Sequence, residues 1–197
     1  MSSRPRGTVT GPDGLPRCPW AVSTTDYLEY HDQEWGREVR GDTALFERLT
    51  LEAFQSGLSW LTILRKRPAF RAAFAGFDPE RVAAFGPHDV QRLMADAGIV
   101  RNRAKIAATL ANAAATVELG EGGLSELVWR HRPGRGRAPR LLTDVPASTP
   151  QSVTLARALK GAGFRFVGPT TAYALMQACG VVDDHLLGCV SRGAPGG

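Results

Sequence analysis

The sequence contains few cysteines and no long apolar segment. Its 197 residues include only three cysteines, spread along the whole chain, which do not form the disulfide framework of a small secreted protein. No run of about 18 apolar residues occurs, and the first residues lack the apolar stretch of a signal peptide. These absences exclude a membrane span and a secretory signal, and we therefore expect a soluble, cytoplasmic protein without a membrane partner.

Lysine is also scarce. Only three of the 24 basic residues are lysines, so 21 are arginines, and 19 acidic residues leave a net charge of +5. The excess lies in residues 130–140, which contain no acid and five arginines: Arg130, Arg132, Arg135, Arg137 and Arg140. The rest of the chain is balanced, so the basic composition alone is a weak indication of a nucleic-acid partner.

The length and a hydrophobic content of 43% predict one folded domain, which we place at residues 17–192. Residues 1–16 are rich in Gly, Pro, Ser and Arg without periodicity, and they are expected to form a disordered tail. Residues 193–197 have a similar composition and predict a flexible C-terminus. Within the domain, residues 130–148 are expected to form a long arginine-rich loop.

The periodic signals inside the domain are helical. Asp42 or Thr43 can cap a helix that ends at Gly57, and Ser59 can cap a second helix that Pro68 stops. Further helices are expected to begin near residues 79, 88, 102, 150 and 169. No convincing series of alternating strands occurs, so the predicted fold class is all-α.

Two Cys–His pairs at opposite ends of the sequence suggest a metal site. His185 and Cys189 are four residues apart and would share one face of a helix. Cys18 and His31 form the second pair, and two thiolates with two imidazoles suit a closed, structural zinc site. The spacing is not that of a standard zinc finger, so buried cysteines and ordinary histidines remain an alternative. Cys179 lies on an apolar stripe and is expected in the core.

Residues 88–117 predict two helices joined by a tight turn, in the manner of a helix-hairpin-helix. Backbone N–H groups at the start of the second helix favour a phosphate oxygen, and such a contact holds DNA without reading its sequence. The expected DNA contacts around this turn are Gly98, Val100, Arg101, Arg103 and Lys105. An ordinary packing corner between two helices is the alternative, because Val100 replaces the second glycine common in this motif.

Glu52 lies on the apolar stripe of its predicted helix, where an unpaired charge is costly. It therefore needs a partner, a proton or a ligand. Five Trp and Tyr residues occur in the same third of the chain: Trp20, Tyr27, Tyr30, Trp35 and Trp60. Aromatic faces stack on planar bases and attract a cationic base more strongly, although a core built from Trp and Tyr is the alternative.

Seven short segments occur in a recognisable order. They are Arg17–Trp20, Tyr30–Gly36, Leu51–Trp60, Asp96–Arg101, Gly163–Gly168, Met176–Gly180 and Asp184–Cys189. Together these segments resemble the bacterial DNA-3-methyladenine glycosylase I family over about residues 17–190. The resemblance implies an all-α helix-hairpin-helix DNA glycosylase fold and hydrolytic release of 3-methyladenine from alkylated double-stranded DNA. We expect the enzyme to act as a monomer.

The resemblance also implies the site residues. One structural zinc ion would bind Cys18, His31, His185 and Cys189 and so tie the two chain ends together. The base pocket would contain Glu52, Tyr30 and Trp60, with Trp20, Tyr27 and Trp35 nearby.

The chemistry of the lesion suggests a role for each pocket residue. Methylation at N3 makes adenine cationic, so the base leaves as a neutral molecule without needing an acid. Trp60 would stack on the base, the Tyr30 hydroxyl would make a polar contact, and an ionised Glu52 would accept a hydrogen bond from the exocyclic amino group. Gln55 or Leu58 would fill the gap that the flipped base leaves in the duplex.

Two residue patterns predict a monofunctional hydrolase. Residues 107–117 contain no acid, and Lys105, assigned to the hairpin, is unsuited to forming a Schiff base.

Three questions stay open. The chain could be a non-catalytic binder of alkylated or distorted DNA, or a zinc-stapled interaction module, and the arginine-rich loop could add a salt-sensitive phosphate contact.

Overall fold

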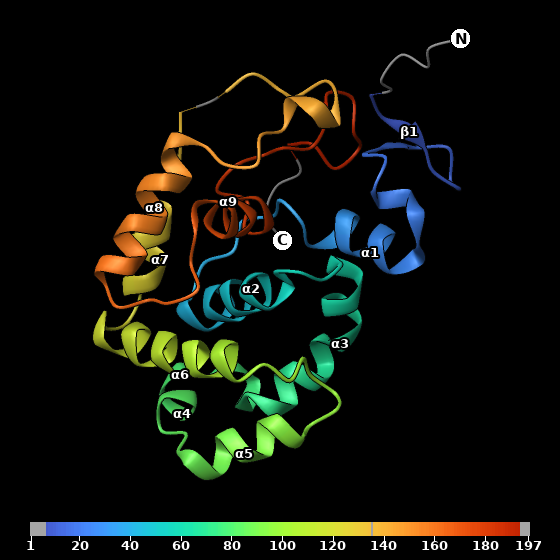
Figure 1. The fold of residues 1–197 in the computed structure, drawn as a ribbon. Helices are drawn as coiled ribbons and strands as arrows, with labels where there is room; N and C mark the ends of the chain where they lie inside the picture. The colour runs from blue at the N-terminus through green and yellow to red at the C-terminus, as the bar shows by residue number, and fades with distance from the viewer. Residues whose placement is uncertain (1–6, 135, 194–197) are drawn as a thin grey trace.

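A computed structural model describes residues 7–134 and 136–193 (Figure 1). Nine α-helices occur in this part of the chain: α1 Thr25–Gln33, α2 Asp42–Gln55, α3 Trp60–Ala73, α4 Pro79–Ala83, α5 Pro87–Ala95, α6 Arg103–Glu118, α7 Gly123–Trp129, α8 Pro150–Gly161 and α9 Pro169–Ala178. The only strands of the described ranges are β1 (Val9–Thr10) and β2 (Pro16–Arg17), which pair antiparallel. The prediction of a helical fold is confirmed.

Four helix starts agree with their sequence signals. Ser59 caps α3 by accepting a hydrogen bond from the backbone N–H of Thr62, and the Asn102 side chain caps α6 in the same way. Asp78 and Thr149 cap α4 and α8, each directly before a proline at the first helical position.

Two helix boundaries differ from the prediction. The N-cap of α2 is Gly41, because the Asp42 carboxylate accepts a hydrogen bond from the backbone N–H of Ser125 instead. Pro68 does not end α3, which continues to Ala73. A proline removes only one intrahelical hydrogen bond, and the following turn is held because Phe70 and Phe74 are fully buried.

Helix α2 lies in the centre of the molecule, with α9 on one side and α6 on the other (Figure 1). Its side chains Leu45, Phe46, Leu49 and Phe54 are completely buried. The α4–α6 segment and the β1–β2 hairpin lie at opposite ends of the molecule (Figure 1). Because α2 packs on both α6 and α9, its surface residues lie between these two helices.

The N-terminal segment is folded where the sequence predicted a disordered tail. Residues 7–17 form the β1–β2 hairpin, and the backbone N–H of Val190 donates to the carbonyl of Pro16 at 2.9 Å. Arg17 is only 4% exposed and forms ion pairs with Asp13 and Asp32. The expected tail is therefore wrong for residues 7–16, because contacts with the distant end of the chain order it. The first six residues and residues 194–197 lie outside the described ranges.

The arginine-rich segment, residues 130–148, is a loop that contains one short 3₁₀ turn, Leu142–Asp144. It lies at the opposite end of the molecule from α5 and α6 (Figure 1). Arg130 and Arg132 lie within 3.4 and 3.9 Å of Glu126 and Glu38, and Arg135 lies outside the described residues.

Among the helices that the structure describes, none is long and apolar enough to cross a membrane.

Candidate active site and metal centre

A cavity of about 270 Å³ opens beside α2. Its lining combines aromatic and polar side chains: Trp20, Tyr27, Tyr30, Trp35, Glu52, Gln55, Trp60, Ala174 and Gln177. The structure thus brings together all six side chains that the sequence analysis assigned to a base pocket. Gln55, expected as a wedge, also faces this cavity. Ala174 and Gln177, both from α9, were not expected; the only signal was a polar residue within an apolar helix.

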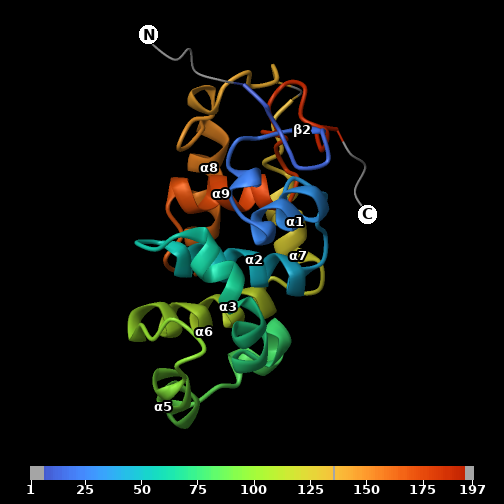
Figure 2. The same cartoon turned by 90° about the vertical axis from the view of Figure 1, so that its right-hand side faces the viewer.

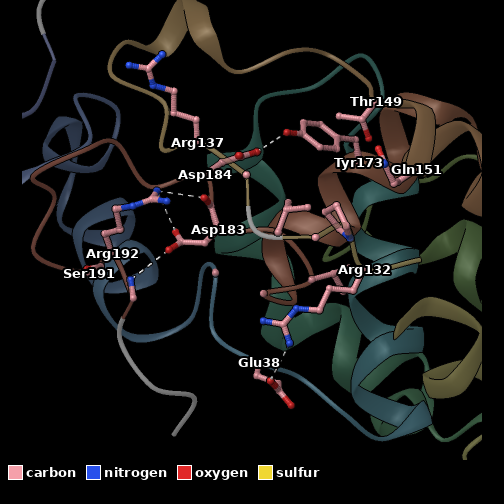
Figure 3. A pocket seen from close by; sticks show the side chains of 18 residues that line it. Glu38, Arg132, Arg137, Thr149, Gln151, Tyr173, Asp183, Asp184, Ser191 and Arg192 are labelled. Carbon is pink, nitrogen blue, oxygen red and sulfur yellow. Dashed lines mark hydrogen bonds and ion pairs between the residues drawn. The ribbon is translucent and has the colours of Figure 1, made fainter. Parts of the chain in front are cut away.

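A larger cavity of about 710 Å³ lies between the arginine-rich loop and the C-terminal segment (Figure 3). Several of its charged groups already pair with one another, since Arg192 lies 3.7 Å from Asp183 and Arg132 lies 3.9 Å from Glu38. Tyr173 is the only aromatic residue among those that line it. Size alone therefore does not identify the functional site, and the smaller aromatic cavity has the chemistry to hold a planar base.

Trp20 is the centre of the aromatic cluster. Its ring meets those of Trp35 and Tyr27 edge to face, at centroid distances of 5.1 and 5.7 Å. The rings of Tyr30 and Trp60 lie 5.4 Å apart. The Tyr27 hydroxyl accepts a hydrogen bond from the backbone N–H of Leu61, which fixes α1 against the start of α3. The walls of the cavity are therefore rigid before any ligand enters.

Glu52 is the charged residue of this cavity. Its side chain is only 8% exposed, and no described residue forms a hydrogen bond or ion pair with its carboxyl group. Burial raises its pKa to about 8, against the smaller opposing effect of Arg48 one turn earlier on α2. At neutral pH the carboxyl group therefore retains its proton, which is one of the possibilities that the sequence left open.

A second buried glutamate on α2, Glu47, has the hydrogen-bond partner that Glu52 lacks. Glu47 is also 8% exposed, but its carboxylate accepts a hydrogen bond of 2.8 Å from Arg71. Glu52 has no such partner, and an unpaired buried carboxyl group is stabilising neither as an acid nor as an ion. The buried position of Glu52 is explained if its carboxyl group binds a ligand.

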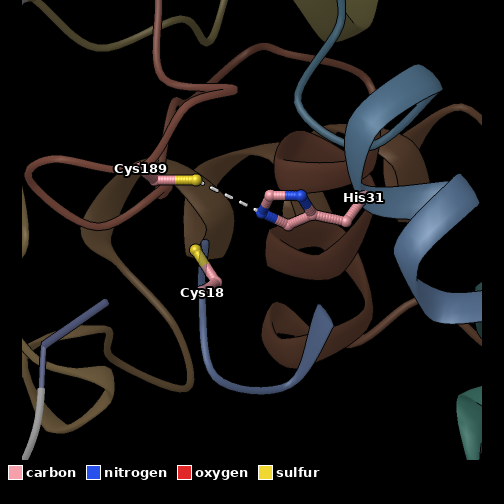
Figure 4. A group of neighbouring side chains, drawn as sticks. All are labelled: Cys18, His31 and Cys189. Carbon is pink, nitrogen blue, oxygen red and sulfur yellow. Dashed lines mark hydrogen bonds between the residues drawn. The ribbon is translucent and has the colours of Figure 1, made fainter. Parts of the chain in front are cut away.

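Three predicted metal ligands lie together (Figure 4). The ligand atoms of Cys18, His31 and Cys189 are within 4.8 Å of one another, and all three residues are buried. A hydrogen bond from the Cys18 thiol lowers the pKa of Cys189 to about 4 and raises that of Cys18. One of the two sulfur atoms is therefore available as a thiolate, the form that binds metals.

His185 is outside that group of three but next to it. Its ring centroid lies 4.9 Å from that of His31, and its buried Nε2 atom has no hydrogen-bond partner. The expectation that His185 and Cys189 share a helical face is wrong, because they lie on an irregular segment after α9. A turn in which the Cys189 N–H donates to Leu186 brings them close together. Gly36 makes room for the His185 ring, since a Cβ atom there would lie 2.5 Å from Cε1.

The surroundings of both histidines fit a bound metal cation. Nδ1 of His31 lies 2.7 Å from the Asp32 carboxylate, and Nδ1 of His185 lies 2.9 Å from that of Asp183. Such carboxylate contacts are typical of metal-binding histidines, because they fix the ring and leave Nε2 for the metal. A cation would also satisfy the unpartnered Nε2 of His185.

The candidate metal centre and the aromatic cavity share two walls. Trp20 packs edge to face on His31 at 5.1 Å, and Trp35 packs on His185 at 4.7 Å. The same two tryptophans line the cavity. Anything that holds the two histidines in place therefore also holds two faces of the cavity.

Residues 88–117, the segment predicted to form the hairpin, lie in α5, a turn over residues 96–102, and α6. Arg101 and Arg103 are exposed, and Val100 packs partly against the core. The backbone N–H of Gly98 already donates to the Asp96 carboxylate at 2.7 Å, so Gly98 does not offer this group to a phosphate. The DNA contact predicted for Gly98 would therefore use another atom, and the exposed start of α6 remains for an anion.

Lys105 does not face solvent as the sequence analysis expected. It is 7% exposed, and its ammonium group donates to the backbone carbonyls of Phe54 and Ser56 at 2.9 and 2.8 Å. These carbonyls belong to the C-terminal end of α2, where a positive charge is favourable. Burial lowers the pKa of Lys105. The assignment of Lys105 to phosphate binding is wrong. Its ammonium group instead holds the C-terminal end of α2 against α6.

The anchored segment is the turn between α2 and α3. The Leu58 N–H donates to the Gln55 carbonyl, and Gly57 adopts a φ of +84°, which favours glycine. The Leu58 side chain is 42% exposed at the tip of the turn, while Gln55 faces the cavity. This turn and the start of α6 lie on the same edge of the molecule (Figure 2).

The chain is similar to known proteins in both sequence and fold. The family described as methyladenine glycosylase matches residues 20–192. DNA-3-methyladenine glycosylase 1 of Escherichia coli strain K12 is 45% identical over 180 residues, which cover 89% of this chain and 96% of the relative. A crystal structure of a 3-methyladenine DNA glycosylase I superimposes with a TM-score of 0.85 at 44% identity, covering 89% of this chain and 99% of the other. A second structure, with a TM-score of 0.83 at 34% identity, covers 89% and 97% and is a variant in complex with 3-methyladenine.

Proposed function

The chain belongs to the methyladenine glycosylase family, and on that premise we propose that it releases 3-methyladenine from alkylated DNA in base-excision repair. The observation that carries the proposal is Glu52, a buried and unpaired carboxyl group in a cavity lined by five aromatic residues. This cavity suits a flat base with a positive charge, because aromatic faces and a carboxylate both stabilise a cation.

The reaction is hydrolysis of the N-glycosidic bond. The nucleotide flips out of the duplex, which costs a few kcal/mol and less for a damaged base. Trp60 stacks on the base, and the Tyr30 hydroxyl makes a polar contact with it. The positive charge of the lesion lowers the pKa of Glu52, so that its proton leaves and the carboxylate accepts a hydrogen bond from the exocyclic amino group. The base departs as a neutral molecule, and water attacks the sugar.

We infer that the enzyme is monofunctional and leaves the DNA strand intact. No lysine is among the residues that line the cavity, and the Lys105 ammonium group is bound to two backbone carbonyls. Schiff-base cleavage of the strand needs a free amine at the sugar, which this arrangement does not supply.

We infer that one zinc ion binds Cys18, His31, His185 and Cys189. Two thiolates and two imidazoles suit zinc, and four protein ligands close the coordination sphere, so the ion supplies structure rather than chemistry. The bound ligands would hold Trp20 and Trp35 against the cavity and join the N-terminal hairpin to the C-terminal segment.

The DNA partner is double-stranded, and a single copy of the chain acts on it. The start of α6, with Arg101 and Arg103, holds the phosphate backbone, while Leu58 enters the gap left by the flipped base. Replacing Arg101 by Glu is expected to reduce DNA affinity markedly, whereas a zinc-stapled protein without a role in DNA would be insensitive to this change.

The deciding experiment is incubation of the protein with methylated DNA, followed by chromatography of the released bases. Free 3-methyladenine is expected from the natural protein and not from a Glu52→Ala variant whose circular dichroism shows an intact fold. Binding of methylated DNA without release of any base would contradict the proposal and support a non-catalytic binder.

A further inference from the structure

Helix α9 contributes the polar side chain of Gln177 to the aromatic cavity, and its amide is held in one orientation. Tyr173 and Gln177 are one helical turn apart and share a face of α9. The Tyr173 hydroxyl and the Gln177 amide nitrogen both donate to the same carboxylate oxygen, Oδ2 of Asp184, at 2.5 and 2.8 Å. Figure 3 shows the Tyr173–Asp184 bond from the side of the larger cavity.

The orientation of the Gln177 amide follows from these bonds. A carboxylate only accepts hydrogen bonds, so the NH₂ end of the amide must face Asp184. Asp184 lines the larger cavity, whereas Gln177 lines the aromatic one. The amide therefore lies in the wall between the two cavities, and its carbonyl oxygen Oε1 is the end left for a ligand in the aromatic cavity.

We infer that Gln177 is a specificity-determining residue that accepts a hydrogen bond from the exocyclic amino group of the flipped base. An amino group has two N–H donors, and Glu52 from α2 and Gln177 from α9 would accept one each. A base with a carbonyl at this position would place its oxygen against Oε1 of Gln177 and gain no hydrogen bond there. Asp184 acts through Gln177 and is a positioning residue. The inference rests on the proposed function.

Gln177 supplies a discrimination that Glu52 does not. Burial raises the pKa of Glu52 to about 8, so this carboxyl group either donates or accepts near neutral pH. A protonated Glu52 can donate a hydrogen bond to the carbonyl of a guanine lesion. The Gln177 amide cannot reverse its polarity without breaking its bond to Asp184, so it rejects the carbonyl in either state of Glu52.

The test compares two bases released from one sample of methylated DNA, 3-methyladenine and 3-methylguanine. The ratio of the two kcat/KM values does not depend on how much of a variant is folded. In Gln177→Met, which keeps the size and removes the amide, we expect this ratio to fall about tenfold, the loss of roughly one hydrogen bond. Gln177→Ala is made in parallel, and Gln91→Met, at an exposed position on α5, is the matched control.

The outcomes separate the two ideas. If the natural protein releases neither base, the proposed function is wrong. If it releases 3-methyladenine but both Gln177 variants keep the natural ratio within twofold, Gln177 only packs against the cavity and the inference is overturned, even if both rates fall together.

The role of Asp184 is tested by a double substitution. Asp184→Asn lets the amide turn over and is expected to reduce the base ratio in the natural background. In the Gln177→Met background the same change should leave the ratio unaltered, because Asp184 then has no amide to orient. An equal further loss in both backgrounds would refute the positioning role. Metal content is measured in each variant, since Asp184 precedes His185.

Discussion

Replacing Glu52 by Gln should make the protein more stable while it abolishes base release. The pKa of Glu52 is about 8 in the folded protein, against 4.5 for an ordinary glutamate. Between these two pH values the unfolded chain has lost the proton and the folded protein keeps it. Folded-state stability therefore falls as the pH rises, by about 1.4 kcal/mol per pH unit. At neutral pH the accumulated cost is roughly 3 kcal/mol, and glutamine, which does not titrate, avoids it.

The assay is urea unfolding of both proteins between about pH 5 and pH 8. All other titrating groups are common to the two proteins, so the difference between their unfolding free energies isolates residue 52. This difference should grow steadily with pH and level off above the pKa of about 8. Glu47→Gln is the matched control, and it should destabilise the protein because it removes the negative charge that pairs with Arg71. Parallel stability curves for Glu52→Gln and the natural protein would refute the reasoning.

Three further predictions follow from the same site. In base release, kcat/KM should rise about tenfold per pH unit and level off near the Glu52 pKa of about 8, because an ionised carboxylate is the acceptor; a flat profile would show that it is not. Cys189→Ala should lose one equivalent of zinc by elemental analysis, lower the melting temperature and weaken 3-methyladenine binding, whereas Cys179→Ala, a core position, should retain the metal. Lys105→Met should cost about 2 to 4 kcal/mol of unfolding free energy, because two carbonyls lose a charged donor, but leave the salt dependence of DNA binding unchanged. Arg101→Ala should reduce by about one the slope of the logarithm of the DNA binding constant against the logarithm of the salt concentration.

Local signals predicted most helix starts and the most unusual residue of the cavity. Ser59, Asn102 and Thr149 cap helices where the sequence placed them, because a cap depends on neighbouring residues alone. Glu52 was identified because a charge on an apolar stripe requires an explanation. The same reasoning would have found Gln177, a polar residue on the apolar helix α9, although its orientation depends on Asp184 beyond the end of that helix.

Most errors concern contacts between distant parts of the chain. Lys105 lies beside two exposed arginines in sequence, and only the position of the α2 C-terminus shows that its ammonium group points inward. Residues 7–16 have the composition of a disordered tail, but a hydrogen bond from Val190 and the buried ion pairs of Arg17 order them. Spacing placed His185 and Cys189 on a helix, whereas an irregular turn brings them together. For Lys105 and residues 7–16 the partner is far away in the sequence, whereas for His185 and Cys189 the spacing did not determine the local backbone conformation.

The distribution of charge has a consequence for how DNA is held. The arginine-rich loop accounts numerically for the whole net charge, yet it lies at the opposite end of the molecule from the hairpin. Arg101 and Arg103, by contrast, are exposed at the start of α6, within the predicted hairpin. A contact close to the flipped nucleotide must fix its position as well as attract it, and a helix start does both because its N–H groups are rigid. The hairpin is thus suited to setting the register of the DNA on the enzyme. The loop can change only the strength and salt dependence of binding, so replacing its arginines should leave the choice of base unaffected.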